Sequence, residues 1–208
     1  MDIQAAYDNW SLSYDQDRNL TRDLDQATTR KFFADKRYRN ILELGCGTGK
    51  NTVLLADISD AVTALDFSKG MIEQARLKIT TDNVELSVAD LTRQWPTHND
   101  TYDLIVCNLV LEHVQDLGFI FSEAFRSLQK GGHLYISELH PFRQYLGGKA
   151  NFQRGDKITE VKAYIHHVSE FLQLAGNNGL SLQSFNEHWH QDDLGKPPRL
   201  AVFMFAKE

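Results

Sequence analysis

Short apolar runs alternate with amphipathic segments along the first two thirds of the chain. The apolar runs predict buried strands over residues 41–44, 61–66, 84–88, 102–107 and 133–137. The amphipathic segments between them predict helices over residues 51–58, 68–79 and 117–128. Strands that alternate with helices at short intervals indicate a parallel sheet that is covered on both faces.

The pattern changes after the fifth predicted strand. Residues 140–163 are polar, rich in glycine and aromatic side chains, and too long for a routine connection, so we expect a functional insert on the substrate side. A helix is predicted over 164–175, and two strands over 180–190 and 200–205 flank a loop with adjacent prolines, which indicates a hairpin. Residues 1–39, rich in aromatic and charged side chains, are expected to form two helices before the first strand.

These elements predict a single α/β domain over residues 1–208. Its centre is expected to be a Rossmann-like seven-stranded, mostly parallel sheet with helices on both faces and an antiparallel C-terminal hairpin strand. The composition, with 42% hydrophobic and 24% charged residues, is ordinary for a globular domain of this size.

Charge and run length argue against several classes of partner. The net charge of −6 argues against sequence-independent binding of nucleic acid, which needs lysine and arginine to displace phosphate counterions. No apolar run approaches the roughly 20 residues of a membrane span, and the N-terminus lacks a signal-peptide pattern, so we expect a cytoplasmic protein. Cys46 and Cys107 lack a C-x-x-C spacing and are expected to be reduced packing residues, with no bound metal.

A glycine-rich loop follows the first predicted strand. Gly45, Gly47 and Gly49 stand at alternate positions, where glycine lets a loop turn tightly and lets a ligand lie against the main chain. In a dinucleotide-binding fingerprint the third glycine comes one residue later, at the position that Lys50 occupies here. The spacing therefore favours a nucleoside ligand without a pyrophosphate.

Polar residues stand at the ends of the next strands, where an open parallel sheet binds its ligand. Asp66 follows the first glycine by about 20 residues, the place of a carboxylate that accepts hydrogen bonds from both hydroxyls of a ribose. Phe67 is placed to cover an adenine ring, and the pair Asp90 and Leu91 to bond its edge. The alternatives are a helix cap for Asp66 and a turn for Asp90. Asn108 ends the fourth strand and either binds ligand or caps the turn.

Five segments together resemble the class I S-adenosylmethionine-dependent methyltransferases, in the small-molecule branch called type 11. The similar segments are residues 42–52, with the pattern acidic-x-G-x-G-x-G, and residues 65–68, 88–90, 102–114 and 128–136. The resemblance implies S-adenosylmethionine as cofactor and S-adenosylhomocysteine as product. The cofactor contacts that it implies are Tyr14, Glu43, Gly45, Cys46, Gly47, Gly49, Asp66, Phe67, Asp90, Leu91 and Asn108.

The N-terminal segment also bears on the cofactor. Residues 10–15, Trp-Ser-Leu-Ser-Tyr-Asp, are similar to the aromatic and acidic segment by which that branch folds a helix over the bound cofactor. The resemblance implies that residues 1–39 form a helical lid with Tyr14 as a contact. The alternative for Tyr14 is an aromatic side chain that holds the N-terminal helix to the core.

The acceptor side carries candidates for proton removal. Five histidines fall in segments predicted to surround the cleft, and imidazole is matched to proton transfer near neutral pH. His140 is the first choice for a catalytic base because it ends the fifth strand, followed by His113 and then His166. The irregular spacing of the histidines gives no readable metal signature. The remaining candidates, for substrate binding, are Glu138, Arg143, Tyr145, His167, Trp189 and Arg199.

The predicted function is transfer of a methyl group from S-adenosylmethionine to oxygen, nitrogen or carbon of a small-molecule acceptor. A non-catalytic cofactor-binding or scaffold protein is the alternative from another class. A nicotinamide-dependent reductase is disfavoured by Lys50 and by the lack of a Tyr-x-x-x-Lys pair after the fourth strand. The identity of the acceptor, the roles of Arg143 and Arg199 as clamps or structural salt bridges, and the oligomeric state remain open.

Overall fold

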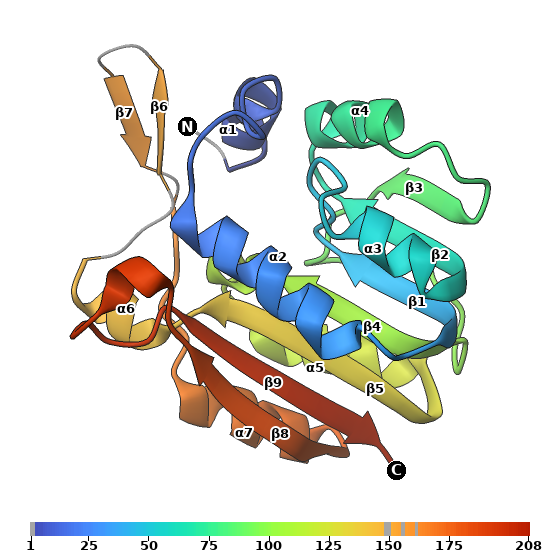
Figure 1. Ribbon diagram of the computed structural model, residues 1–208. Helices are drawn as coiled ribbons and strands as arrows, with labels where there is room; N and C mark the ends of the chain where they lie inside the picture. Colours follow the sequence, from blue (N-terminus) through green and yellow to red (C-terminus); the bar gives the residue numbers. More distant parts are fainter. Residues whose placement is uncertain (1–2, 148–150, 155–156, 161) are drawn as a thin grey trace.

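The computed structural model describes residues 3–147, 151–154, 157–160 and 162–208. Within them, a seven-stranded sheet has the strand order β3-β2-β1-β4-β5-β9-β8 (Figure 1). The parallel strands are β1 (Tyr38–Leu44), β2 (Ser59–Asp66), β3 (Val84–Val88), β4 (Tyr102–Asn108) and β5 (Leu128–Leu139). The antiparallel hairpin is formed by β8 (Leu180–His188) and β9 (Leu200–Lys207). The predicted Rossmann-like sheet is therefore confirmed.

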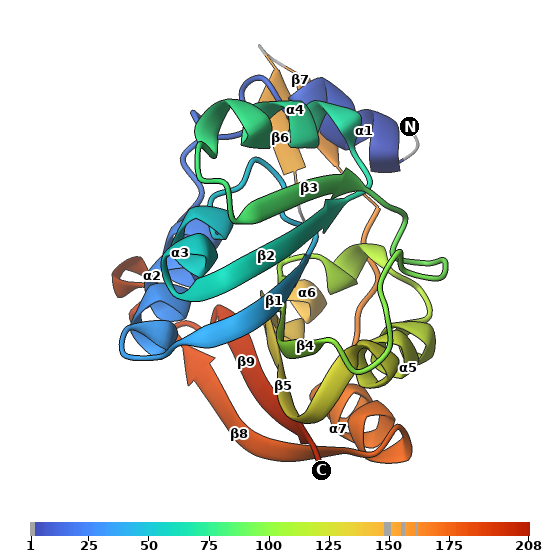
Figure 2. The ribbon, with the colours of Figure 1, turned by 90° about the vertical axis from the view of Figure 1, so that its right-hand side faces the viewer.

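Helices cover both faces of this sheet (Figure 2). One face packs against α5 (Leu117–Ser127) and α7 (Val168–Asn177). The other packs against α2 (Leu20–Phe33), α3 (Thr52–Asp57) and α4 (Lys69–Lys78). Successive side chains of β4 alternate between the two layers, and this is why an unbroken apolar run specifies a central strand. None of the helices in the described ranges has the length and apolar character needed to cross a membrane.

Two predicted boundaries were wrong because long-range contacts override local pattern. The helix predicted from Tyr164 begins four residues later, at Val168, since the Tyr164 amide donates to the Glu112 carbonyl oxygen at 2.6 Å and residues 162–167 form no regular secondary structure. The fifth strand begins at Leu128 rather than at residue 133, because Leu128 already pairs with Tyr102 beside a register shift.

The insert contains more regular structure than its composition predicts. It holds α6 (Pro141–Tyr145) and a two-stranded hairpin of β6 (Asn151–Arg154) and β7 (Lys157–Glu160). Figures 1 and 2 both place this hairpin at the same end of the molecule as α1 (Ile3–Trp10). The insert hairpin and the N-terminal helix thus lie at one end of the molecule although they are far apart in the sequence.

A buried ion cluster ties α6 to the sheet. The side chain of Asp193 is fully buried and accepts two hydrogen bonds from Arg199, each at 2.7 Å. It also forms an ion pair with Arg143 at 2.9 Å. Arg199 also donates to the hydroxyl of Thr21 on α2 at 3.0 Å. Hydrogen bonds from the two arginines hold the pKa of Asp193 well below its usual range. Arg143 and Arg199 therefore form the structural salt bridge that the sequence left as an alternative.

We predict that Asp193→Asn destabilises the fold by about 3–5 kcal/mol, because it leaves two arginines without their buried partner. The folded-state pKa is lowered, so this stabilisation is complete above the unfolded-state value and is lost as the pH falls through the folded-state value. Urea unfolding of both proteins should therefore show a difference that shrinks below about pH 4. Asp192→Asn, at a partly exposed neighbouring position, is the control; an equal loss there would contradict the assignment.

The turn from β1 into the glycine loop depends on two left-handed residues. Gly45 has φ +69° and Gly47 has φ +54°. The amides of Gly45 and Cys46 both donate to the Leu65 carbonyl oxygen, which fixes the loop to β2. A Cβ atom at Gly45 would lie 2.1 Å from Val110 Cγ2, whereas one at Gly47 would have no neighbour within 4 Å.

This contrast gives a matched pair of variants. Gly47→Ala should cost about 1–2 kcal/mol, the price of a left-handed alanine. Gly45→Ala should cost about 1–3 kcal/mol more, because its methyl group also overlaps Val110 in a packed region. Chemical denaturation measures the loss in free energy of unfolding for both variants. Equal losses would show that the Val110 side chain moves aside without destabilising the fold.

Candidate functional site

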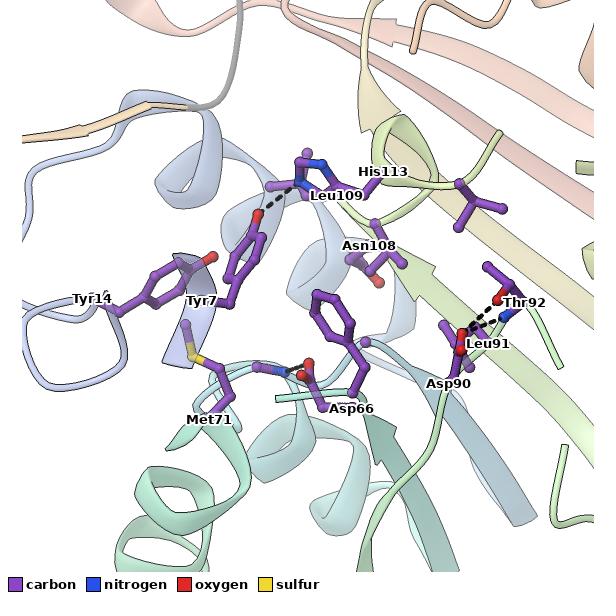
Figure 3. A pocket seen from close by; sticks show the side chains of 15 residues that line it. Tyr7, Tyr14, Asp66, Met71, Asp90, Leu91, Thr92, Asn108, Leu109 and His113 are labelled. Atoms are coloured by element: carbon purple, nitrogen blue, oxygen red, sulfur yellow. Dashed lines mark hydrogen bonds between the residues drawn. The ribbon is translucent and has the colours of Figure 1, made fainter. Parts of the chain in front are cut away.

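An open pocket, with about 700 Å³ of empty space when the solvent at its mouth is included, lies at the carboxyl ends of the parallel strands (Figure 3). Its walls come from the glycine loop, from the ends of β2, β3 and β4, from the short helix η1 (Leu111–His113) and from the N-terminal segment. Eight of the predicted cofactor contacts line it, namely Tyr14, Gly45, Gly47, Asp66, Phe67, Asp90, Leu91 and Asn108. The pocket also has seven other lining residues, Tyr7, Met71, Thr92, Leu109, Val110, His113 and Val114.

Asp66 joins the glycine loop to the start of α4. Its carboxylate accepts hydrogen bonds from the amides of Gly47 and Ser68, each at 2.9 Å. Ser68 itself caps α4 by accepting from the Met71 amide at 3.1 Å, so the helix cap is Ser68 and not Asp66. Burial raises the pKa of Asp66 to about 6. A buried carboxylate at the pocket wall is what a ribose-binding role requires.

Asp90 adopts the turn that the sequence left as its alternative. One carboxylate oxygen accepts from both the amide and the hydroxyl of Thr92, at 2.9 and 2.6 Å. Arg93 approaches the other oxygen at 3.3 Å. The turn nevertheless holds Asp90 and Leu91 against the pocket, so the two interpretations are compatible.

Three cofactor contacts implied by the resemblance lie behind the pocket wall. Glu43 is buried and accepts from the Thr52 hydroxyl at 2.6 Å. Cys46 is a buried, free cysteine, like Cys107. Gly49 backs onto α4, where a Cβ atom would lie 2.8 Å from Ile79. These residues support the shape of the loop rather than line the cavity.

Glu138, predicted to bind substrate, instead holds the loop after β4. It is buried, and one carboxylate oxygen accepts from the amides of Val110 and Leu111, each at 2.8 Å. Leu109, just before them, has φ +56°, an unusual conformation for a branched residue. The two hydrogen bonds therefore fix a strained turn that leads directly to His113.

The pocket region is rich in buried acids. Burial raises the pKa of Glu43 to about 7 and that of Glu138 to about 8, beside the value of about 6 for Asp66. Among the described residues none of these three carboxyls has a lysine or arginine partner within ion-pair distance. Such a region favours a cationic ligand. The described residues contain no group of three or more His, Cys, Asp or Glu arranged to hold a metal ion.

The N-terminal segment lies across this pocket. Asp8 on α1 accepts from the Ser68 hydroxyl at 2.6 Å and from the Gly70 amide at 3.1 Å. Asp15 accepts from the Thr48 hydroxyl at 2.7 Å, which joins the segment to the glycine loop. Tyr14 lines the pocket and also packs under Arg22, 4.0 Å from its ring centre, so the structure combines both interpretations of this tyrosine.

Of the three candidate bases, the structure brings only His113 into the pocket. Its Nδ1 lies 2.9 Å from the Lys162 carbonyl oxygen and its Nε2 lies 2.7 Å from the Tyr7 hydroxyl (Figure 3). A carbonyl oxygen only accepts hydrogen bonds, so Nδ1 carries the proton and Nε2 of the neutral ring is an acceptor. Burial raises the pKa of Tyr7 well above its ordinary value, which keeps the phenol protonated as the donor.

The other two candidate bases lie outside this pocket. His140 directly follows the end of β5, but its Nδ1 accepts from the Phe142 amide at 3.1 Å to cap α6, and its Nε2 faces Glu187 at 3.0 Å. His166 is buried with Nε2 2.7 Å from the Val114 carbonyl oxygen. His140, the first choice for a base, thus lies outside the pocket and caps a helix that the sequence pattern did not predict.

The remaining substrate candidates do not line the pocket either. Tyr145 hydrogen-bonds His167 on the surface, and the half-exposed Trp189 donates to the Lys196 carbonyl oxygen at 3.0 Å. The most important residue that sequence reasoning missed is Tyr7. Its signal was present, since it lies in the aromatic N-terminal segment one heptad before Tyr14.

Comparisons with known proteins agree with this geometry. Residues 42–136 match the profile of the family described as a methyltransferase domain, type 11. A malonyl-acyl-carrier protein O-methyltransferase from Acetivibrio thermocellus is 32% identical over 175 residues, which are 77% of this chain and 61% of the relative. A demethylmenaquinone methyltransferase from Clavibacter sepedonicus is 31% identical over 141 residues, 65% of this chain and 57% of the relative. The chain thus spans about three fifths of the length of these two relatives.

The fold has relatives among solved structures. An S-adenosylmethionine-dependent methyltransferase from Mesorhizobium loti superimposes with a TM-score of 0.74 at 20% identity, covering 90% of this chain and 100% of the other. The matched profile contains the glycine loop, Asp66, Asp90, Asn108 and His113. The profile match and the relatives make this chain similar to the type 11 branch of the class I S-adenosylmethionine-dependent methyltransferases, and the solved structures share its fold.

Proposed function

We propose that the protein transfers the methyl group of S-adenosylmethionine to a small molecule whose accepting oxygen or nitrogen carries a proton. The observation that carries this proposal is the state of His113. Its Nδ1 is committed to a carbonyl oxygen, and its Nε2 faces the pocket region as a hydrogen-bond acceptor. A ring held in this tautomer is prepared to remove a proton.

The strand order supports one direction for the cofactor in the pocket. Asp90 at the end of β3 and Asp66 at the end of β2 are suited to adenine and ribose. The amino-acid part then lies over the glycine loop and β4, and the methyl group faces the β4 side, where η1 presents His113. The buried acids of this region favour the positive charge of the sulfonium.

The chemistry asks little of the protein beyond alignment. The thioether that leaves is neutral, so the rate depends on holding the acceptor in line with the carbon–sulfur bond and on taking up its proton. Tyr7 supports the placement of the acceptor, because its own phenol donates to Nε2 at 2.7 Å. A hydroxyl group of the methyl-accepting substrate that takes the place of the Tyr7 hydroxyl would donate its hydrogen bond to the same atom, Nε2 of His113.

The relatives differ in what they methylate, so similarity alone does not select an acceptor. Their names include a malonyl-acyl-carrier protein O-methyltransferase and a demethylmenaquinone methyltransferase. An ionised carboxylate has no proton to lose and needs no base, whereas a phenol does. The geometry of His113 therefore favours phenolic acceptors. A non-catalytic cofactor-binding protein has no comparable need for this imidazole.

We predict that the protein binds S-adenosylmethionine and S-adenosylhomocysteine, and that Asp66→Ala weakens both by about 1.5–3 kcal/mol because charge-assisted bonds to two hydroxyls are lost. Titration calorimetry measures the affinities. Asp60→Ala, an exposed position on the same strand, is the matched control. Binding of NADH in place of the sulfur nucleosides would contradict the cofactor assignment.

The activity is tested with a panel of small phenols, amines and acids, by release of S-adenosylhomocysteine. On the acceptor so found, His113→Gln should lower turnover by about 100-fold or more while cofactor affinity stays unchanged. His140→Gln is the matched comparison and should retain activity, because that ring caps α6 outside the pocket. Full activity of His113→Gln would leave alignment as the source of rate, and transfer to carboxylic acids alone would refute the preference for protonated acceptors.

A further inference from the structure

A carboxylate on the covering helix α2 sits at the junction of two loops that build the pocket. Asp25 is 3% exposed. Its Oδ1 accepts from Nδ2 of Asn108 at 2.7 Å, and its Oδ2 accepts from Nδ2 of Asn51 at 3.1 Å. Asn108 ends β4, and Asn51 ends the glycine loop at the start of α3. One side chain from α2 therefore contacts both loops.

This carboxylate dictates how the two amides are turned. A carboxylate accepts hydrogen bonds and donates none, so each asparagine must present its NH₂ end to Asp25. The hydroxyl of Thr29 accepts the second N–H of Asn108 at 2.9 Å, which leaves that amide no freedom to turn over. The carbonyl oxygens of both amides consequently face away from Asp25.

Both of these carbonyl oxygens are buried and have no hydrogen-bond partner within the described part of the chain. A buried acceptor without a partner is costly, and most buried polar atoms in folded proteins are paired. Asn108 lines the pocket between the glycine loop and η1 (Figure 3). The unpaired Oδ1 of Asn108, unlike that of Asn51, belongs to a residue that lines the pocket, where a ligand can supply a donor.

The surroundings select the class of donor. The amino-acid part of S-adenosylmethionine ends in an ammonium group, which has three N–H donors and no acceptor. Burial raises the pKa of the Asp25 carboxyl, and a cation nearby would relieve the cost of its charge. Asp66 and Asp90, on the far side of β1, are suited to the ribose and the base, so the remaining end of the ligand lies over β4.

We propose that Asp25 is a positioning residue that holds the Asn108 amide with Oδ1 turned toward the pocket, where it accepts a hydrogen bond from the cofactor's α-ammonium group. This inference deepens the proposed function and rests on it. Asp25 acts through Asn108 and needs no contact with the ligand. In Asp25→Asn, the new side-chain NH₂ group can donate a hydrogen bond to Oδ1 of Asn108. The Asn108 amide can then turn over.

The test compares two probes that differ in the amino-acid part. S-adenosylhomocysteine carries the ammonium group, and methylthioadenosine has the same base, ribose and sulfur without it. Titration calorimetry should show that Asp25→Asn lowers the affinity for S-adenosylhomocysteine by about 10-fold or more, since hydrogen bonds to charged groups are strong. The affinity for methylthioadenosine should stay unchanged. Asp23→Asn, exposed on the same helix, should change neither affinity.

Each other outcome has a defined meaning. Equal losses for both probes, or no loss for either, would overturn the positioning role of Asp25. Wild-type protein that binds neither probe would refute the proposed function itself, whereas equal binding of both would refute the ammonium subsite alone. If circular dichroism shows that Asp25→Asn does not fold, Asn108→Leu removes the same oxygen and leaves Asp25 in place. The same selective loss is expected there, and its absence would overturn the inference.

Discussion

Buried carboxyl groups without cationic partners are the costliest feature at the carboxyl ends of the parallel strands. Glu43, Asp66 and Glu138 come from three strands, and Asp25 comes from the helix above them. Burial raises the pKa of all four, so each one costs stability as the pH rises from the ordinary carboxyl range toward its folded-state value. Each is held by donors from the glycine loop, the β4 turn or their neighbours. The attraction between a bound sulfonium cation and these carboxylates would offset the free-energy cost of ionising them in the folded protein.

The strands of the sheet were predictable because the pattern that specifies each one lies within a few consecutive residues. Strands buried on both faces are continuous apolar runs, and β1, β2, β3 and β4 are read directly from them. The glycine loop with Asp66 is equally local, since its meaning depends on spacing within about 20 residues. Boundaries failed where a distant partner decided them, as at Tyr164, whose amide bonds the backbone of η1.

The acceptor side was not predictable, because contacts between residues far apart in the sequence decide its arrangement. His140 directly follows β5 and His113 lies a few residues after β4, and only the fold shows that α6 uses one ring as a cap while η1 turns the other toward Tyr7. Glu138 has the composition of a substrate contact, yet two backbone amides occupy it. Arg143 and Arg199, 56 positions apart, meet on one carboxylate. Such pairings across long stretches of chain leave no periodic signal.

The attachment of α1 has a consequence for the kinetics of the whole cycle. Asp8 attaches the segment to the start of α4, Asp15 attaches it to the glycine loop, and Tyr7, next to Asp8, is hydrogen-bonded to His113. A ligand that enters or leaves the pocket past this segment must break these hydrogen bonds. We expect the breaking of these hydrogen bonds to limit the rate of product release. The single-turnover rate should therefore exceed the steady-state rate.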